Sequence, residues 1–111
     1  MWTLASEVCE VVITAPDADW LVTFTRQLVT DHLAASAHTV TEVRSVYEWR
    51  GELIERSEAR AAVRTRTSLV PIIAGRLGVA HPYEVPGIVA MPIIATSQAY
   101  GDWLLAQTEA P

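Results

Sequence analysis

The chain has 111 residues, half of them hydrophobic, with a mean hydropathy of +0.23, so we expect residues 1–111 to form a single domain around one core. Eight Arg and thirteen Asp and Glu leave a formal net charge of -5, which argues against nucleic acid as a partner because phosphate binding requires a basic surface. No segment reaches the about 20 continuous apolar residues of a bilayer span, so no membrane partner is expected either.

The first two predicted elements are a strand and an amphipathic helix. Residues Glu7–Thr14 are rich in β-branched side chains, which favour a strand. Apolar residues then recur at helical spacing from Asp17 to Leu33, and Asp17 is a favourable N-cap residue. We therefore expect a helix over 17–33.

A long β-hairpin is predicted next. Two strand-like arms, Ser36–Trp49 and Glu52–Arg66, are joined by Arg50 and Gly51, and glycine supplies the positive φ of a two-residue turn. The second arm alternates, which predicts one buried face and one solvated or ion-paired face. The buried face is expected to carry Leu53, Ala59, Ala61 and Val63.

The remaining elements are a helix, a strand and a short closing helix. Thr67–Val79 is predicted to be helical, with Ser68 as its cap and Pro71 in its first turn. Val85–Ile94 reads as a strand, and the two prolines inside it favour an edge position. Ser97–Gln107 is predicted to close the domain as a short helix.

The order β-α-β-β-α-β predicts an α+β, ferredoxin-like sandwich with two helices on one face of an antiparallel sheet. Its hairpin is long, because fourteen extended residues span about 46 Å. A compact chain of this length has a diameter of roughly 34 Å. We therefore expect the hairpin to overhang its domain and to pair in a symmetric homo-oligomer. The alternative is a bent hairpin whose tip packs on its own domain.

The sole cysteine and the N-terminal residues bear on location. Cys9 is the only cysteine, so no internal disulfide is possible. Residues 1–7 have neither a basic start nor an apolar run of signal-peptide length. Both features predict a cytoplasmic protein.

Several short motifs together resemble the CutA divalent-cation-tolerance family. They are Thr14–Asp17, Leu33–Ala35, Ser45–Tyr47 with Trp49 and Gly51, His81–Pro86, and Tyr100–Leu104. The resemblance covers about residues 8–107 and implies a single ferredoxin-like domain that forms a tight homotrimer through its hairpins. It also implies a role in tolerance of, or response to, copper and other divalent cations, without an accepted enzymatic activity.

In some members of that family, copper binding is attributed to a cysteine on the first strand and two adjacent histidines before the Pro-Tyr motif. The corresponding positions here are Ile13, Ala80 and His81, so two of the three implied ligands are missing. Cys9 lies four residues before Ile13, about 13 Å away along an extended strand. A divalent cation such as copper is thus the only cofactor expected, and none is certain.

His81 and Glu84 are the candidate metal ligands, because an imidazole and a carboxylate can bind a borderline metal. The alternative for His81 is that it ends the preceding helix and satisfies carbonyl groups there. For Tyr83 and Glu84 the alternative is structural, with the prolines on either side directing the chain into the last strand.

Four further residues are candidates for a cleft between subunits: Glu58, Arg64, Tyr83 and Trp49. Glu58 and Arg64 match family positions that carry a glutamate and a basic residue. Exposed ion pairs are the alternative for these two. Trp49 is alternatively an interface anchor.

The predicted function is that of a non-enzymatic homotrimer that binds a divalent cation, copper above all, or a small ligand weakly between protomers. The alternative is a trimeric signalling module like the nitrogen-regulatory PII proteins, with Arg60, Arg64 and Arg66 as a phosphate cradle. An acid-base pair of His81 and Glu84 is a third possibility, but no nucleophile or cofactor motif accompanies it.

Overall fold

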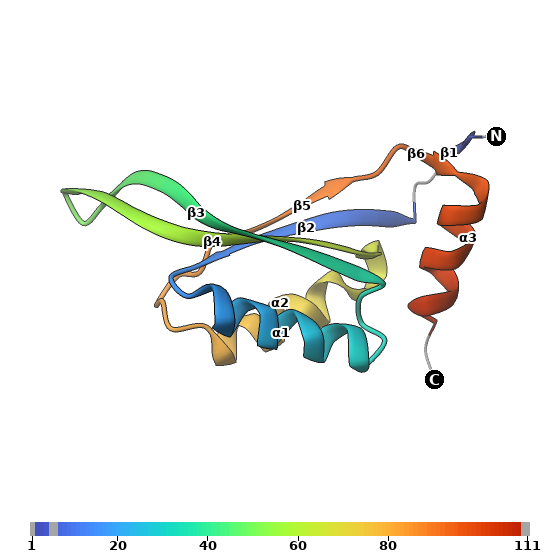
Figure 1. Cartoon of the computed structure of the whole chain (residues 1–111), viewed down its shortest axis with the longest axis horizontal. Helices are drawn as coiled ribbons and strands as arrows, with labels where there is room; N and C mark the ends of the chain where they lie inside the picture. Colours follow the sequence, from blue (N-terminus) through green and yellow to red (C-terminus); the bar gives the residue numbers. More distant parts are fainter. Residues whose placement is uncertain (1, 5–6, 110–111) are drawn as a thin grey trace.

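A four-stranded antiparallel sheet carries two helices on one face in the computed structural model of this chain (Figure 1). The structure describes residues 2–4 and 7–109. The strand order is β3-β4-β2-β5, and a separate two-stranded ribbon pairs β1 with β6. The strands are β1 (Trp2–Leu4), β2 (Val8–Ala15), β3 (Ser36–Trp49), β4 (Glu52–Arg66), β5 (Ile88–Pro92) and β6 (Ala95–Ser97).

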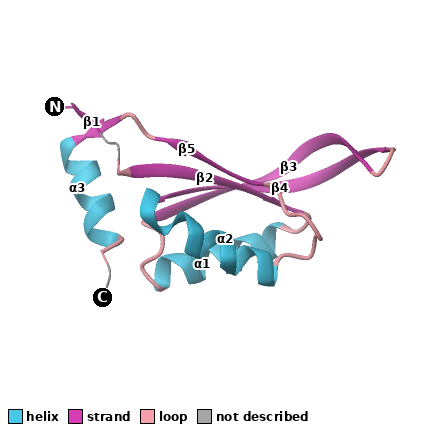
Figure 2. Cartoon of the chain, turned by 180° about the vertical axis from the view of Figure 1, so that it is seen from behind, coloured by secondary structure: helices cyan, strands magenta, loops and turns pink. Residues whose placement is uncertain are grey.

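Three helices complete the fold. They are α1 (Ala18–Thr30), α2 (Val70–Ala80), which follows the 3-10 turn η1 (Thr67–Leu69), and α3 (Gln98–Gln107). Figure 2 shows α1 and α2 side by side under the sheet, and α3 at the end away from the hairpin tip. The predicted ferredoxin-like α+β fold is confirmed. No helix of the described residues is long and apolar enough to cross a membrane.

The core lies between the sheet and the two helices. The inward-facing side chains of β2 and β4 are small or β-branched, and those of α1 and α2 are mostly larger aliphatics. Burial of such side chains is the main driving force of folding, worth about 25 cal/mol per Å² of apolar surface. The central residues include Cys9, Val11, Ile13, Leu21, Leu28, Ala61, Val63, Ile73 and Leu77.

The element boundaries differ from the predicted ones at several ends. Asp17 caps α1 as predicted, because its carboxylate accepts a hydrogen bond from the Asp19 amide at 3.0 Å. The helix ends at Thr30 rather than Leu33, since His32 takes a left-handed φ of 59°. Ser68 does not cap the second helix, which starts from the 3-10 turn with Leu69 at its N-cap. Pro71 does lie in its first turn.

The last predicted strand is much shorter in the structure. Only Ile88–Pro92 pairs as β5, while residues 82–87 form an irregular segment. β5 pairs with β2 at the edge of the sheet, which is the position that its prolines favoured. The β1–β6 ribbon was not predicted, because strands of three residues carry too few positions to show an alternating pattern.

The hairpin arms have the predicted bounds, and the turn residues Arg50 and Gly51 both have positive φ, 51° and 81°. The hairpin extends past α1 (Figure 1), and the molecule is 47 Å long. A bulge interrupts the pairing between Val40 and Val43. The prediction that Leu53 is buried is wrong: it lies beyond the helices and is 70% exposed.

Candidate functional site

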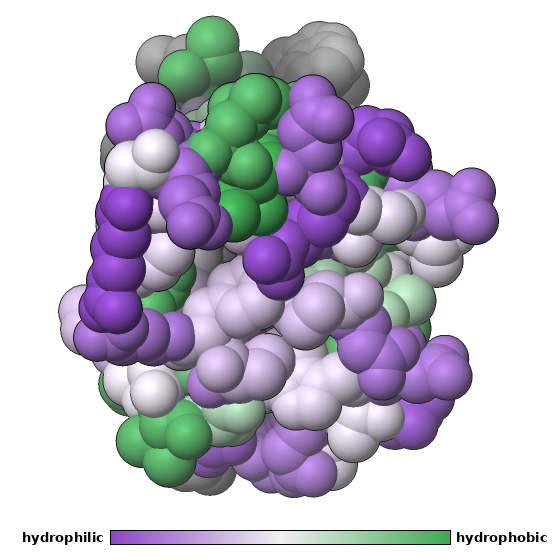
Figure 3. All heavy atoms as spheres, turned by 90° about the vertical axis from the view of Figure 1, so that its left-hand side faces the viewer, coloured by the Kyte–Doolittle hydropathy of each residue, from purple (hydrophilic) through white to green (hydrophobic). Residues whose placement is uncertain are grey.

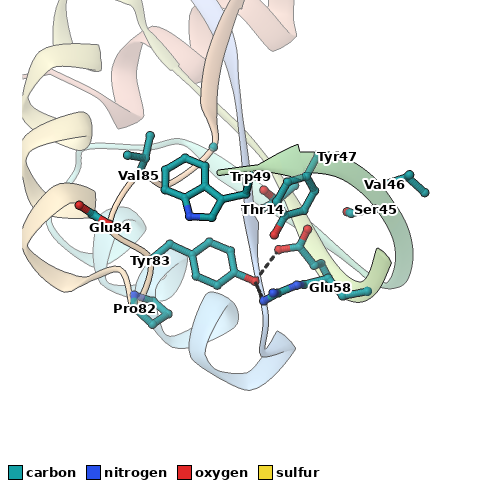
Figure 4. Close-up of a pocket in the computed structure, with 12 residues that line it drawn as sticks. Thr14, Ser45, Val46, Tyr47, Trp49, Glu58, Pro82, Tyr83, Glu84 and Val85 are labelled. Atoms are coloured by element: carbon teal, nitrogen blue, oxygen red, sulfur yellow. Dashed lines mark hydrogen bonds between the residues drawn. The ribbon is translucent and has the colours of Figure 1, made fainter. Parts of the chain in front are cut away.

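A cleft of about 600 Å³ separates the outer half of the hairpin from the irregular segment 82–87. It opens where β2 ends at Ala15, beyond which no strand of the described residues pairs with β4 on that side. Figure 4 shows Tyr83 of the segment pointing toward Glu58 and lying beside Trp49 of the hairpin. Its lining consists of Thr14, Ser45, Val46, Tyr47, Trp49, Arg56, Glu58, Pro82, Tyr83, Glu84, Val85 and Gly87.

His81 sets the direction of the segment at the end of α2. Its backbone amide still bonds to the Leu77 carbonyl at 2.8 Å, but its own backbone is extended, as the following proline requires. The ring is buried and both nitrogens are engaged: Nε2–H donates to the Thr14 carbonyl at 2.8 Å, and Nδ1 accepts from the Tyr83 amide at 3.0 Å. These partners select a neutral imidazole whose role is to fasten the segment to β2.

Tyr83 is the central polar residue of the cleft. Its hydroxyl donates to Glu58 Oε2 at 2.9 Å and accepts from Arg56 Nη1 at 2.9 Å. The Arg56 guanidinium also lies 5.4 Å from the centre of the Tyr83 ring. Partial burial raises the pKa of Tyr83, and the hydrogen bond to Glu58 raises it further. The phenol therefore stays a neutral donor over the physiological pH range.

Glu58 is the buried carboxylate of the cleft, with 5% of its surface exposed. A charged group is retained at such a position only when it is paired or hydrogen-bonded. Tyr83 supplies the hydrogen bond, and Arg56 supplies positive charge through the same hydroxyl. The cleft thus contains a buried, hydrogen-bonded carboxyl group beside aromatic walls.

At the outer rim of the cleft, an ion pair connects the hairpin tip to the segment 82–87. Arg50 at the hairpin tip contacts Glu84 of the segment, with 2.7 Å between Nη2 and Oε2. Both side chains are about two-thirds exposed, and Arg50 also lies over the Trp49 ring at 5.3 Å. The tip therefore overhangs the domain and contacts it at the same time, which is a feature of the bent-hairpin alternative.

The residues at the copper positions of the family do not fit a copper site within one protomer. Ile13 is fully buried in the core and Ala80 has no ligand atom, while the two nitrogens of His81 are already hydrogen-bonded. Cys9 faces the core, where burial raises the pKa of its thiol and so disfavours the thiolate that binds metals. Within residues 2–4 and 7–109, no group of three His, Cys, Asp or Glu could hold a metal ion.

The structure brings most of the predicted site residues together and separates one. Glu58, Tyr83, Glu84 and Trp49 line the same cleft. His81 lies behind it and contacts it through the Tyr83 amide. Arg64 is elsewhere: it binds Glu10 and the Tyr100 hydroxyl at the far end of β4.

Sequence reasoning did not select three further lining residues: Arg56, Thr14 and Tyr47. The alternation of the second hairpin arm placed Arg56 on the same face as Glu58, two positions away, and this was the available signal. Thr14 and Tyr47 belong to the family motifs Thr14–Asp17 and Ser45–Tyr47, but nothing in those motifs marked them as site residues. Their approach to the segment 82–87 depends on the tertiary path of the chain.

Comparisons with known proteins find relatives of this chain in sequence and in fold. A family model described as CutA1 divalent ion tolerance protein matches residues 9–107. The divalent-cation tolerance protein CutA of Thermus thermophilus is 39% identical over 98 residues, covering 88% of this chain and 95% of that protein. The solved structure of Cut A1 from the same organism has a TM-score of 0.88 and 37% identity, covering 92% of this chain and 99% of that chain.

A human relative is longer than this chain. Human protein CutA is 32% identical over 97 residues, which cover 87% of this chain and 54% of that protein. The chain therefore spans about half the length of this relative.

Proposed function

Because this chain belongs to the CutA1 divalent ion tolerance family, we propose that it acts as a non-enzymatic homotrimer that binds a small ligand in the cleft between the hairpin and the segment 82–87. The observation that carries the proposal is the Tyr83–Glu58 hydrogen bond inside this cleft. Binding sites for small molecules are typically concave and largely apolar, with a few fixed polar groups. Aromatic walls around one held carboxylate match that description.

The overhang of the hairpin supports the trimer. Its tip carries Val46 and Leu53, which are 63% and 70% exposed. Seen from the tip, apolar surface is interleaved with polar surface (Figure 3). Among the residues that the structure describes, no strand pairs with the outer edge of β3. A second copy of the chain would cover both features, and the cleft would then lie beside the subunit boundary.

Sedimentation equilibrium at micromolar concentration tests the trimer. The expected species has three times the 12.2 kDa protomer mass. A species of 12.2 kDa would contradict it and would favour the hairpin that packs only on its own domain.

The cation part of the proposal is weak binding at the carboxylates of the cleft, Glu58 and Glu84, with copper as the first metal to test. A metal at His81 would have to displace the hydrogen bond to Thr14 or the one from Tyr83. Copper calorimetry on the wild type and on His81→Ala should therefore give the same weak isotherm. Loss of copper binding in a folded His81→Ala variant would show that His81 is a copper ligand.

Small-molecule binding is tested by a thermal-shift screen, because a ligand that binds only the folded state raises the melting temperature. A compound that stabilises the wild type should lose most of its effect in Glu58→Gln, which keeps the shape of the side chain but not its charge. Glu55→Gln, an exposed position on the same strand, is the matched control. A compound that stabilises all three proteins equally does not bind at Glu58.

The PII-like alternative, in which the ligand is a nucleotide, is weakened because two of the three arginines of its expected phosphate cradle already have partners. Arg64 is bound to Glu10 and Tyr100, and Arg66 donates to the Leu105 carbonyl at 2.8 Å. Nucleotides included in the same screen are expected to leave the melting temperature unchanged. A shift with nucleotides would favour the PII-like signalling module.

The last two parts of the proposal are that the protein is not an enzyme and that it is cytoplasmic. The only thiol, Cys9, is buried with a raised pKa and is therefore a poor nucleophile. His81 has no free nitrogen to act as a base. A free cysteine also suits a reducing compartment, so we place the protein in the cytoplasm.

A further inference from the structure

The charged groups of the cleft at Tyr83 disfavour a ligand with a net charge. Arg50 is paired with Glu84 at the rim. Arg56 and Glu58 both bond to the Tyr83 hydroxyl inside the cleft. A cationic ligand would lie beside two guanidinium groups, and an anionic ligand would lie beside two carboxyl groups. Either would leave a charge uncompensated in a partly buried site, so the cleft favours a neutral ligand.

Three hydroxyl side chains of the same cleft have no such partners. Thr14 lies near the end of β2, and Ser45 and Tyr47 lie two residues apart on β3, so both point to one face of that strand. All three residues are half-buried, and their hydroxyl groups make no hydrogen bond to another described residue. A hydroxyl group both donates and accepts hydrogen bonds. Ligand hydroxyl groups, which do the same, match them.

Glu58 offers a further free acceptor to a ligand. Its Oε2 accepts from Tyr83, but its Oε1 makes no hydrogen bond among the described residues. The unpartnered side-chain atoms that the described part of the chain fully encloses are Ser36 Oγ, Arg66 Nε and Thr96 Oγ1. Glu58 Oε1 is not one of them, so it keeps some surface on the cleft. A free acceptor on a residue that is only 5% exposed points to a donor on a ligand.

Trp49 gives the cleft a flat apolar wall. It follows Ser45 and Tyr47 on the same face of β3, and 41% of its surface is exposed. Figure 4 shows its indole beside the Tyr83 ring. The C–H groups of a sugar ring pack favourably on an aromatic face, because that face is negative and the C–H groups are weakly positive. One strand thus supplies hydroxyl groups and an aromatic surface to the same space.

We propose that this cleft binds a neutral sugar, an assignment that rests on the function proposed above and names the class of its ligand. The sugar ring packs against Trp49. Its hydroxyl groups bond to the free oxygens of Thr14, Ser45, Tyr47 and Glu58. The cleft volume of about 600 Å³ lies within the range of about 300–1,000 Å³ that is usual for small-molecule sites.

Saturation-transfer NMR on the full chain tests the class of ligand. The probes are the methyl glycosides of D-glucose, D-galactose and D-mannose, which differ only in the orientation of ring hydroxyl groups. At least one should bind with a Kd of about 10 mM or tighter. Methyl glucuronide, which adds a carboxylate, and cyclohexanol, which keeps one hydroxyl group, should each bind at least about tenfold more weakly. The assignment is overturned if none of the glycosides binds saturably, or if either control binds equally well.

Failure of the sugar and failure of the small-ligand cleft give different results. If no glycoside binds but another compound of the thermal-shift screen stabilises the wild type and not Glu58→Gln, only the sugar is wrong. If no compound shows this dependence on Glu58, the function proposed above is wrong as well.

Matched variants locate the sugar. Trp49→Ala should weaken glycoside binding by at least about tenfold. Trp103→Ala, at a tryptophan that is 42% exposed on α3 at the opposite end of the molecule, should leave it unchanged. Ser45→Ala and Tyr47→Phe each remove one hydroxyl group and should weaken binding by about threefold to tenfold. Should Trp49→Ala not fold, these two variants decide, and unchanged binding in both would overturn the assignment.

Discussion

Tyr83 and Glu58 lie 25 residues apart in the chain, and the phenol of one donates to the carboxylate of the other at 2.9 Å. The bond joins the segment after α2 to β4 at the place where β4 has lost β2 as a neighbour. One contact therefore links the two walls of the cleft and gives the buried carboxyl group a hydrogen-bond donor. Two apolar side chains in contact at this place could also have held the segment rigidly. Rigidity alone therefore does not explain the polar pair of Tyr83 and Glu58.

Removing the phenolic hydroxyl of Tyr83 should destabilise the folded protein. Tyr83→Phe is expected to lower the free energy of unfolding by about 1–2 kcal/mol, because Glu58 stays buried while losing its donor. Chemical denaturation measures the change. Tyr47→Phe is the matched control in the same cleft, and it should change the free energy by less than about 0.5 kcal/mol. Equal effects of the two variants would show that the bond to Glu58 contributes nothing.

The raised pKa of Tyr83 predicts a loss of stability at alkaline pH. A group whose pKa is raised by folding contributes stability that is complete below its unfolded pKa and is lost as the pH rises toward the folded pKa. The free energy of unfolding should therefore fall as the pH rises above the ordinary tyrosine value of 10.0. The fall should be shallower in Tyr83→Phe. Parallel pH profiles for the two proteins would contradict the shift.

The ion pair between Arg50 and Glu84 at the rim of the cleft should have a small coupling energy. Arg50 and Glu84 are exposed, and pairs of this kind are worth about 0.2–1 kcal/mol. A double-mutant cycle with Arg50→Gln and Glu84→Gln should give a coupling energy in that range, which disappears near 1 M salt because the charges are screened. A coupling that persists at high salt would mean that the pair is shielded from solvent, for example by a neighbouring subunit.

Cys9 should be unreactive in the folded protein. It is 2% exposed, and burial raises the pKa of its thiol, so both access and thiolate are lacking. A thiol reagent such as Ellman's reagent is expected to label it only after denaturation. Rapid labelling under native conditions would contradict its place in the core.

His81 should act as a structural residue. His81→Ala removes the hydrogen bonds to Thr14 and from Tyr83 and leaves a cavity, so we expect a loss of about 2–4 kcal/mol in the free energy of unfolding. Denaturation of the wild type and the variant measures it. A change below about 0.5 kcal/mol would show that the buried imidazole does not hold the segment in place.

Local patterns in the sequence predict most of the fold. The alternation of the two hairpin arms and the glycine at their turn gave Ser36–Trp49 and Glu52–Arg66 with the bounds that the structure has. The N-cap at Asp17 was equally local. The early end of α1 at Thr30 depended on a left-handed His32, a conformation that no neighbouring residue signals.

Local motifs in the sequence also predicted part of the candidate site. The motif His81–Pro86 and the position of Glu58 singled out the residues of one cleft before their contacts were known. Arg64 was a candidate, with Glu58, for a cleft between subunits, because both match family positions on one face of a strand. Six residues of strand separate them by about 20 Å, and the tertiary partners Glu10 and Tyr100 hold Arg64 elsewhere.

Sedimentation equilibrium on the full chain at micromolar concentration tests whether the protein is a homotrimer whose hairpins overhang their own domains. One species with three times the 12.2 kDa protomer mass is expected. A single species of 12.2 kDa would contradict it, since Val46 and Leu53 at the hairpin tip would then stay exposed to solvent in the working protein.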